Sequence, residues 1–246
     1  MSLPRLVLTP QQLAERSLRL TGPELHHCRS LRLKVGEALL VTDGQGREVA
    51  ATLVRWDRRF VEIELGAETG RNAESALSLT LYQGMARGSK LELVLQKATE
   101  LGLSRFVPVV AARSQGAWAP GPHPQQRRWE EIVRQAARQC GRTRLPEVSP
   151  PLTFAASLED LPAGGLGLIL DEDSAAPALN ATGLVGQAPK TVGLWVGPEG
   201  GFAPEELALA RQRGLRTLGM GPRILRTETA GIVAVALAQF LWGDLG

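Results

Sequence analysis

The sequence is poor in cysteine, in aromatic residues and in long apolar runs. Its 246 residues include only two cysteines, Cys28 and Cys140, and 4% aromatic residues. Two cysteines so far apart give no disulfide framework, which fits a reducing compartment. The most apolar segment, residues 230–242, is too short to cross a bilayer, and residues 1–5 lack the apolar core of a signal peptide. We therefore expect a cytoplasmic protein with no membrane partner.

Several common catalytic motifs are also missing. There is no Gly-x-x-x-x-Gly-Lys-Ser/Thr loop, no His-Glu-x-x-His helix and no Gly-x-Ser-x-Gly elbow. His26, His27 and Cys28 are each able to bind a metal, but consecutive residues of a helix point about 100° apart and no second ligand pair follows. The sequence therefore predicts neither a metal site nor covalent hydrolase chemistry.

Charge is unevenly distributed along the chain. The formal net charge is +3, yet residues 75–150 hold 11 basic and 5 acidic groups, whereas residues 151–246 hold 6 and 10. Of the 28 basic residues 24 are arginines, whose planar guanidinium suits phosphates and stacks on bases. The basic middle segment and the arginine bias favour a nucleic-acid partner.

The first third of the chain is rich in predicted strands. Apolar, partly alternating runs cover residues 38–43, 48–56 and 59–65, and Asp43-Gly44-Gln45-Gly46 has the composition of a hairpin turn. A helical pattern over residues 23–33 brings Arg29 and Arg32 near each other. We expect a small β-barrel domain in residues 1–70, followed by a polar boundary and a second domain in residues 74–246.

From residue 77 onward, strand and helix patterns alternate, which is typical of an α/β fold with a mostly parallel sheet. The predicted strands are residues 77–82, 105–112, 166–170, 191–196 and 215–218, and the predicted helices are residues 90–101, 125–140 and 228–242. Basic side chains on these helices and on the N-terminal helix are candidate RNA contacts. They are Arg29, Arg32, Lys90, Lys97, Arg134, Arg138 and Arg142.

Two glycine-rich segments follow the last two predicted strands. Residues 196–202 read Val-Gly-Pro-Glu-Gly-Gly-Phe, and residues 218–230 read Leu-Gly-Met-Gly-Pro-Arg-Ile-Leu-Arg-Thr-Glu-Thr-Ala. Loops that follow parallel strands meet at the carboxyl edge of the sheet, where open α/β folds bind ligands. Glycine lets backbone approach a ligand closely. The sequence therefore predicts a binding site formed by these two loops.

At these residues the chain resembles the bacterial small-subunit ribosomal RNA uracil-N3 methyltransferases, which belong to the SPOUT superfamily of knotted methyltransferases. The resemblance rests on residues 197–201, 225–230, 96–102 and 139–142, which read Gly-Pro-Glu-Gly-Gly, Leu-Arg-Thr-Glu-Thr-Ala, Gln-Lys-Ala-Thr-Glu-Leu-Gly and Gln-Cys-Gly-Arg. It implies an N-terminal PUA-like RNA-binding domain and a C-terminal α/β domain with a deep trefoil knot. It also implies a homodimer, with helix 228–242 as a candidate interface element.

The same resemblance implies a cofactor and a substrate. The cofactor is S-adenosylmethionine, and the methyl acceptor is N3 of a uridine in 16S rRNA within the assembled small ribosomal subunit. Cofactor contacts are expected mainly from the backbone of strand ends and loops. The implied positions are Leu170, Val196, Gly197, Gly201, Leu218, Gly219, Met220, Ile224 and Leu225.

Methylation of uracil N3 requires loss of the N3 proton, and the resulting charge spreads to O2 and O4. Arg226 is the predicted donor to these oxygens, and Glu199 or Glu228 is the predicted base or the residue that orients Arg226. A structural alternative is an Arg226–Glu228 interaction that only locks the loop. Two functional alternatives also remain: a SPOUT enzyme that methylates ribose or another base, and a noncatalytic dimeric RNA-binding protein.

Overall fold

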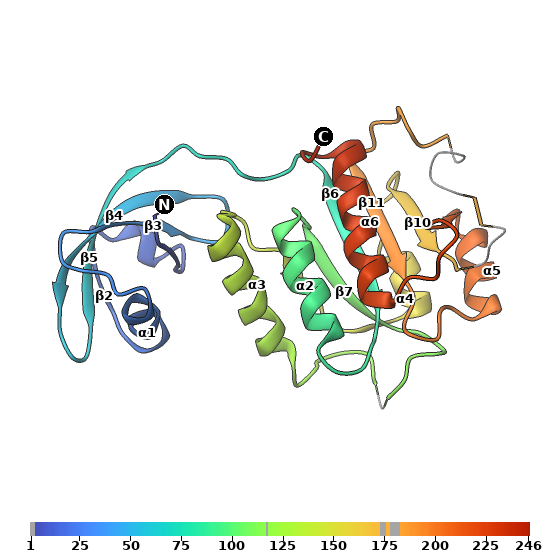
Figure 1. The fold of residues 1–246 in the computed structure, drawn as a ribbon, viewed down its shortest axis with the longest axis horizontal. Coiled ribbons are helices and arrows are strands. Elements are labelled where there is room, and N and C mark those ends of the chain that lie inside the picture. The colour runs from blue at the N-terminus through green and yellow to red at the C-terminus, as the bar shows by residue number, and fades with distance from the viewer. Residues whose placement is uncertain (1–2, 117, 173–175, 178–182) are drawn as a thin grey trace. The chain divides into compact units, whose positions relative to one another are not determined.

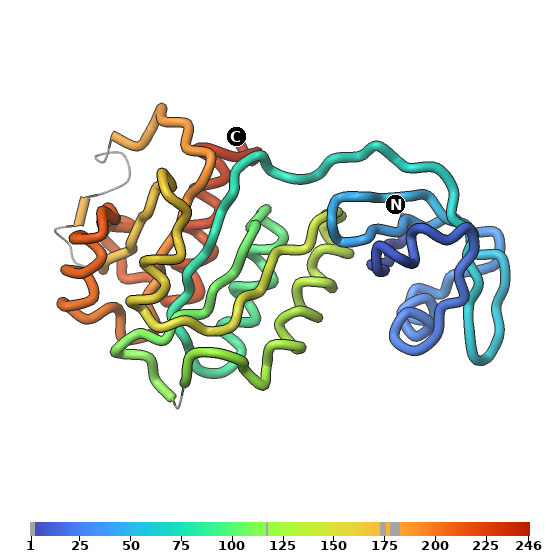
Figure 2. Tube along the Cα trace, turned by 180° about the vertical axis from the view of Figure 1, so that it is seen from behind, coloured from blue at the N-terminus to red at the C-terminus, as the bar shows by residue number. Residues whose placement is uncertain are grey.

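The chain folds into two compact units. The computed structural model describes residues 3–116, 118–172, 176–177 and 183–246 (Figures 1 and 2). The units are Met1–Glu74 with Ala137–Leu145, and Ser75–Ala136 with Pro146–Gly246. The segment 137–145 belongs to the first unit because its Thr143 carbonyl oxygen accepts hydrogen bonds from the Thr42 hydroxyl and the Gly46 N–H.

The first unit is built on a five-stranded sheet with the order β1-β3-β4-β5-β2. Its elements are β1 (Arg5–Val7), β2 (Ser17–Leu20), α1 (Gly22–Ser30), β3 (Ala38–Thr42), β4 (Glu48–Trp56) and β5 (Val61–Glu68). The β1–β3 pair is parallel and the other pairs are antiparallel. The three strands predicted from alternation correspond to β3, β4 and β5, whereas the short β1 and β2 were not predicted.

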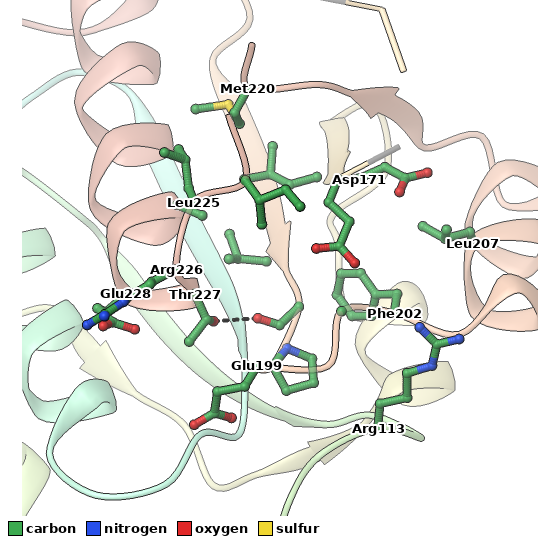
Figure 3. A pocket seen from close by; sticks show the side chains of 18 of the residues that line it. Arg113, Asp171, Glu199, Phe202, Leu207, Met220, Leu225, Arg226, Thr227 and Glu228 are labelled. Carbon is green, nitrogen blue, oxygen red and sulfur yellow. Dashed lines mark hydrogen bonds between the residues drawn. The ribbon is translucent and has the colours of Figure 1, made fainter. Parts of the chain in front are cut away.

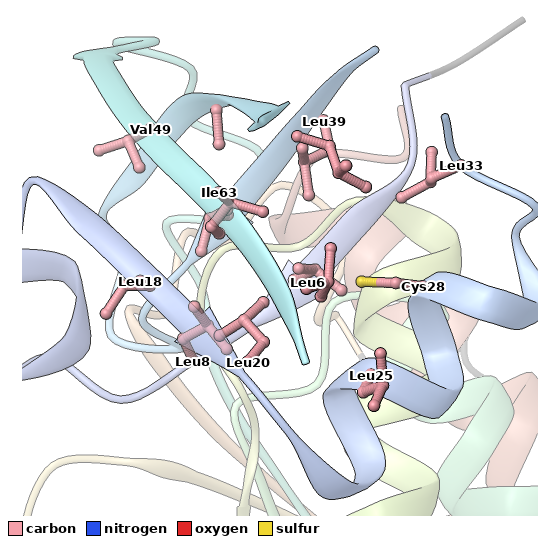
Figure 4. Close-up of a cluster of buried hydrophobic side chains, with 14 of the residues drawn as sticks. Leu6, Leu8, Leu18, Leu20, Leu25, Cys28, Leu33, Leu39, Val49 and Ile63 are labelled. Carbon is pink, nitrogen blue, oxygen red and sulfur yellow. The ribbon is translucent and has the colours of Figure 1, made fainter. Parts of the chain in front are cut away.

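One face of this sheet is covered by its own hydrophobic core (Figure 4). Leu39, Leu53 and Ile63 project into the core from neighbouring strands and are completely buried. Leu25 and Cys28 of α1 pack against the same core. Because side chains alternate along a strand, the residues between them face away from the core. The first unit therefore has one sheet face free to carry polar groups.

The predicted hairpin turn at residues 43–46 is confirmed. The Asp43 carboxylate accepts hydrogen bonds from the N–H groups of Gln45 and Arg47, and Gly44 and Gly46 have φ angles of 72° and 114°. Those angles favour glycine, since they lie in the left-handed region.

The second unit contains a seven-stranded parallel sheet with the order β12-β10-β11-β6-β7-β8, and β9 pairs with β7. The strands are β6 (Ser78–Gly84), β7 (Arg105–Val110), β8 (Glu147–Val148), β9 (Leu152–Thr153), β10 (Leu166–Leu170), β11 (Thr191–Val196) and β12 (Arg216–Leu218). The helices are α2 (Lys90–Glu100), α3 (Gln126–Cys140), α4 (Phe154–Glu159), α5 (Pro204–Gln212) and α6 (Thr227–Trp242). The α/β class predicted from strand–helix alternation is confirmed.

Helices cover both faces of this sheet. α2 and α6 lie side by side over one face, where α6 contacts β6 and β11 (Figure 1). On the other face, Ile169 and Trp195 share a core with Phe154 of α4 and Ala210 of α5. Strands buried on both faces are continuous apolar runs, which is why β10 and β11 were predictable from composition. Because both faces of the sheet are covered, a ligand can reach the strands only at their ends.

The resemblance implies a trefoil knot in the second unit, where part of the chain between β10 and β11 is not described. Residues 173–175 and 178–182 of that connection lie outside the described residues, so the knot stays a prediction. None of the described helices is both long and apolar enough to span a membrane.

Candidate functional site

A cavity of about 730 Å³ lies beyond the carboxyl ends of β10, β11 and β12 (Figure 3). This volume falls within the range of roughly 300–1,000 Å³ that is usual for small-molecule sites. The two glycine-rich loops and the first turn of α6 form much of its wall. The predicted meeting of the two loops at this edge of the sheet is therefore confirmed.

Seven of the nine residues implied as cofactor contacts line this cavity. They are Leu170, Val196, Gly197, Gly201, Met220, Ile224 and Leu225. The other two support the wall: Leu218 is buried beside α6, and Gly219 donates its N–H to the Pro177 carbonyl oxygen at 2.9 Å. A Cβ atom on Gly219 would come within 2.7 Å of the Ala176 carbonyl oxygen, so the close approach requires glycine here.

The loop after β11 is pressed against the end of β6. A Cβ atom on Gly84, the last residue of β6, would lie 2.3 Å from the Pro198 nitrogen. Real Cβ contacts do not reach this distance. Glycine at position 84 therefore allows the Gly197-Pro198 backbone to lie directly on the strand end.

A buried hydrogen-bond chain ties this loop to α6. The Gln83 side-chain amide donates to the Thr227 hydroxyl at 2.8 Å. The Thr227 hydroxyl in turn donates to the Gly197 carbonyl oxygen at 2.5 Å, the bond drawn as a dashed line in Figure 3. Gln83 is completely buried and Thr227 is 8% exposed. We call Gln83, Thr227 and Gly197 the β6–α6 clamp, because they join one strand, one loop and one helix at the cavity.

Glu199 is held by two donors at the cavity wall. Its Oε1 accepts hydrogen bonds from Lys90 Nζ at 2.9 Å and from the Arg87 N–H at 3.0 Å. Desolvation acts to raise the pKa of Glu199, but the hydrogen bonds from Lys90 and the backbone, together with the Lys90 charge, outweigh it and lower the pKa. Glu199 is therefore ionised at neutral pH and is a weakened proton acceptor.

Arg226 and Glu228 stand at the start of α6. Arg226 is the N-cap residue and is exposed, and Glu228 lies in the first helical turn. Within the described part of the chain these two side chains form no ion pair with each other. Glu228 Oε2 is buried and has no hydrogen-bond partner among the described residues. The alternative in which an Arg226–Glu228 pair locks the loop therefore has no support in this structure.

The rest of the wall combines apolar and acidic groups. Phe202 and Leu207 add apolar surface, and Asp171 and Glu172 add two carboxylates directly after β10. Asp171 lies 3.7 Å from Arg211, whereas the Glu172 side chain approaches Gly201. Apolar walls, exposed loop backbone and carboxylates suit a ligand with a flat ring and a positive charge, so these residues fit S-adenosylmethionine.

Comparison with known proteins identifies the family. The RNA methyltransferase domain profile matches residues 73–239, and the RNA methyltransferase PUA domain profile matches residues 20–66. The Synechocystis protein named ribosomal RNA small subunit methyltransferase E is 35% identical to this chain, and the match covers 94% of this chain and 76% of that protein. The Bacillus subtilis protein of the same name is 31% identical, and the match covers 95% of this chain and 94% of that protein. The chain belongs to the ribosomal RNA small subunit methyltransferase E family.

A solved member of this family has the same fold. The crystal structure of the Neisseria gonorrhoeae protein bound to S-adenosyl methionine is 31% identical and superposes with a TM-score of 0.90, covering 100% of both chains. The N-terminal unit is thus PUA-like and the C-terminal unit has the α/β methyltransferase fold, as the resemblance predicted.

The candidate RNA contacts of this family member are scattered over several elements. Lys90 lines the cavity and binds Glu199, Lys97 pairs with Glu100 at 2.8 Å, and Arg134 lies 3.7 Å from Glu131. Of the others, Arg138 lies in the last turn of α3, Arg29 lies in α1, and Arg32 follows α1 with a φ of 53°. As RNA contacts, all six of these side chains remain predictions.

Arg142 needs a correction. Its guanidinium is buried and bonds Glu74 through Nε at 3.0 Å and Nη2 at 2.8 Å. The other Glu74 oxygen accepts hydrogen bonds from the N–H groups of Thr143 and Arg144. This arginine therefore staples segment 137–145 to the first unit and is not available to RNA. Its partner is 68 residues away, so the local sequence gave no sign of the pairing.

Sequence reasoning missed two polar residues at the site. Arg113 lines the cavity and donates to the Gly200 carbonyl oxygen at 3.1 Å. It follows β7, so the rule that sites lie beyond carboxyl strand ends could have found it. Gln83 is a polar residue inside an apolar, doubly buried strand, and this exception to the pattern was an available signal. Among the described residues, no cluster of histidine, cysteine and carboxylate side chains could hold a metal ion.

Proposed function

We propose that this chain methylates N3 of a specific uridine in 16S rRNA. As a member of its family, the chain is an S-adenosylmethionine-dependent methyltransferase of small-subunit ribosomal RNA. One observation carries the choice of N3. A cationic donor, Arg226, and a carboxylate with a free buried oxygen, Glu228, line the same side of the cavity (Figure 3).

The cavity residues hold the cofactor in this proposal. S-adenosylmethionine, when bound, supplies a methyl group carried by a positively charged sulfur. Leu170, Ile224 and Leu225 would bury the apolar part of the cofactor, and the backbone of the two loops would bind its polar edges. Asp171 and Glu172 would favour its positive charges and disfavour phosphate.

Arg226 and Glu228 then act on the uracil. Arg226 would donate hydrogen bonds to the uracil oxygens and stabilise the negative charge that forms when N3 loses its proton. We assign the base to Glu228 rather than to Glu199. Both carboxylates have a buried Oε2 with no hydrogen-bond partner among the described residues, but Glu199 Oε1 accepts two hydrogen bonds and the pKa of Glu199 is lowered. Glu199 would instead keep Lys90 at the cavity wall as a second cation near the RNA. In this assignment Arg226 is the hydrogen-bond donor, Glu228 is the base and Glu199 positions Lys90.

We further propose that the enzyme works as a homodimer on the assembled subunit. α6 carries apolar side chains on its outer side, and Phe240 is 61% exposed. A second copy of the chain could cover this surface. Phe240→Glu should then yield a monomer in light scattering coupled to size-exclusion chromatography, and an unchanged mass would reject α6 as the interface. A cytoplasmic location follows from the substrate.

The product of the reaction tests the proposal. Small subunits from cells that lack the modification would be incubated with methyl-labelled S-adenosylmethionine, and the digested RNA would be analysed by mass spectrometry. We expect 3-methyluridine at one position, and none with Arg226→Lys although that variant still binds cofactor. A ribose-methylated product would overturn the N3 assignment while keeping the methyltransferase. Unlabelled RNA, with cofactor bound and the protein folded, would favour a noncatalytic RNA-binding protein.

A further inference from the structure

Five arginines gather at one end of the sheet in the first unit. The register places Arg19 of β2 and Arg55 of β4 on either side of Glu62 of β5. The turn between β4 and β5 adds Arg58 and Arg59, and α1 adds Arg29. We call this set the arginine cluster: Arg19, Arg29, Arg55, Arg58 and Arg59, all of them exposed.

Contacts within the cluster hold the guanidinium groups together. The guanidinium carbons of Arg19 and Arg55 lie 4.8 Å and 5.5 Å from the centroid of the Phe60 ring. A guanidinium placed over an aromatic ring keeps its N–H groups available to other partners. Arg29 Nη2 donates to the Arg58 carbonyl oxygen at 2.6 Å, which ties α1 to the turn. Like charges are thus kept close together.

Few carboxylates balance these charges. Glu62 lies 3.6 Å from Arg19, and Asp57 uses an oxygen to accept the Arg59 N–H at 2.9 Å. Within the described residues, the guanidinium groups of Arg55, Arg58 and Arg59 form no ion pair. Two carboxylates against five arginines leave an excess of three positive charges on a small surface.

The other end of the same sheet is different. There Arg47 of the β3–β4 hairpin bonds Glu68 of β5 at 2.6 Å, and Arg5 of β1 lies 3.5 Å from the buried Glu48. Arginine is therefore paired with acid at one end of the sheet and left with excess charge at the other. Surface composition alone does not explain this difference within a single sheet.

We propose that the arginine cluster is a docking surface for the phosphate backbone of the substrate RNA. This inference rests on the proposed function, since it takes ribosomal RNA as the substrate. Phosphates would neutralise the excess charge and release counterions. The planar guanidinium groups can bind phosphates through two N–H groups at once, and unstacked bases can stack on the Phe60 ring. This combination suits RNA better than an acidic protein surface.

The test compares two double variants that remove the same charge. Arg58→Ala with Arg59→Ala removes part of the cluster, and Arg213→Ala with Arg216→Ala removes two exposed arginines of the second unit. Binding to 16S rRNA transcripts would be measured from low to high salt, with kcat and KM on subunits. The cluster variant should lower the salt dependence by about 0.7–0.9 in the log–log slope per lost phosphate contact. Its KM should rise, while kcat and cofactor affinity stay unchanged.

Four outcomes would overturn this surface, the function on which it rests, or the role of Phe60 in it. Equal slopes and equal KM values for the two double variants would reject it, provided that the wild-type protein methylates RNA. A wild-type protein that methylates no RNA would instead reject the proposed function. Weaker binding to subunits with unchanged binding to bare rRNA would indicate a ribosomal protein as the partner and reject RNA docking. Phe60→Leu should weaken RNA binding without changing the salt slope, and unchanged affinity would remove Phe60 from the surface.

Discussion

In the second unit the sheet is parallel and helices cover both of its faces, so the cavity is built from loops beyond the carboxyl edge. In the first unit the sheet is mostly antiparallel and buries one face, and the arginine cluster lies at one end of this sheet, on β2, β4, the β4–β5 turn and α1. The general difference between parallel and antiparallel sheets explains both placements. The cavity is enclosed by loops, whereas the side chains of the arginine cluster are exposed. The predictions below test the cavity at the sheet edge, and one of them compares the two sheets directly.

The largest effect is expected from the proposed base at the edge. Glu228→Gln keeps the shape of the side chain and removes its ability to take a proton, so kcat should fall about 100- to 10,000-fold. Glu199→Gln should reduce kcat less, because Glu199 acts through Lys90. Turnover under saturating cofactor and subunits, with cofactor affinity measured separately, distinguishes the two. A larger loss for Glu199→Gln would move the base to that residue.

A glycine-to-alanine substitution should destabilise the second unit more than the first. Gly84→Ala would place a Cβ atom 2.3 Å from the Pro198 nitrogen, so the loop must shift. We expect a loss of about 1–3 kcal/mol in unfolding free energy, the usual cost of inserting an extra carbon atom into a well-packed core. We also expect weaker cofactor binding. Gly66→Ala in β5 is the matched control, because its Cβ would find the nearest atom at 3.4 Å. Chemical denaturation would measure both, and equal losses would refute the claim that the edge is packed more tightly.

The β6–α6 clamp provides a finer test of the edge. Thr227→Val keeps the volume but removes the hydroxyl that joins Gln83 to Gly197, which leaves buried polar groups unpaired at a cost of about 1–3 kcal/mol. We expect weaker cofactor binding with a smaller change in kcat, as measured by calorimetry and steady-state kinetics. Thr227→Ser retains the hydroxyl and should restore the affinity. Failure of serine to do so would show that the methyl group of Thr227 is what matters.

The smallest effect concerns pH. Because the pKa of Glu199 is lowered in the folded protein, its contribution to stability is complete above the pKa of an unfolded glutamate, about 4.3. The contribution is lost as the pH falls through the lower, folded pKa. The difference in melting temperature between the wild-type protein and Glu199→Gln should therefore shrink on acidification below about pH 4.3. A difference that stays constant down to the lowest pH at which the protein folds would contradict the Lys90–Glu199 pairing.

The fold was predictable where burial alone determines an element. The apolar runs of β10 and β11 predicted those strands with the observed bounds. By contrast β1 and β8 have three and two residues, and they are strands only because β3 and β7 lie beside them. A pattern within so short a segment cannot indicate a partner that is far away in the chain.

The site was predictable in its backbone and less so in its side chains. The glycine-rich loops and Arg226 were identified because glycine, proline and charge stand out in sequence. Glu199 was identified too, but not its partner, because the Lys90–Glu199 contact joins residues 109 positions apart. Of the arginine cluster only Arg29 was predicted as an RNA contact, because its members come from α1, β2, β4 and the turn after β4, and no short window contains them all.

The core of the second unit also contains a natural optical reporter. Trp195 is fully buried and stacks on Tyr82 with ring centroids 4.0 Å apart, and it stands two residues before Gly197 of the clamp. Trp56 is the single tryptophan of the first unit, so the variant Trp56→Phe confines intrinsic fluorescence to the second unit. The emission spectrum of that variant would then follow the unfolding of the methyltransferase unit alone. Melting of the second unit thus becomes observable without a contribution from the first.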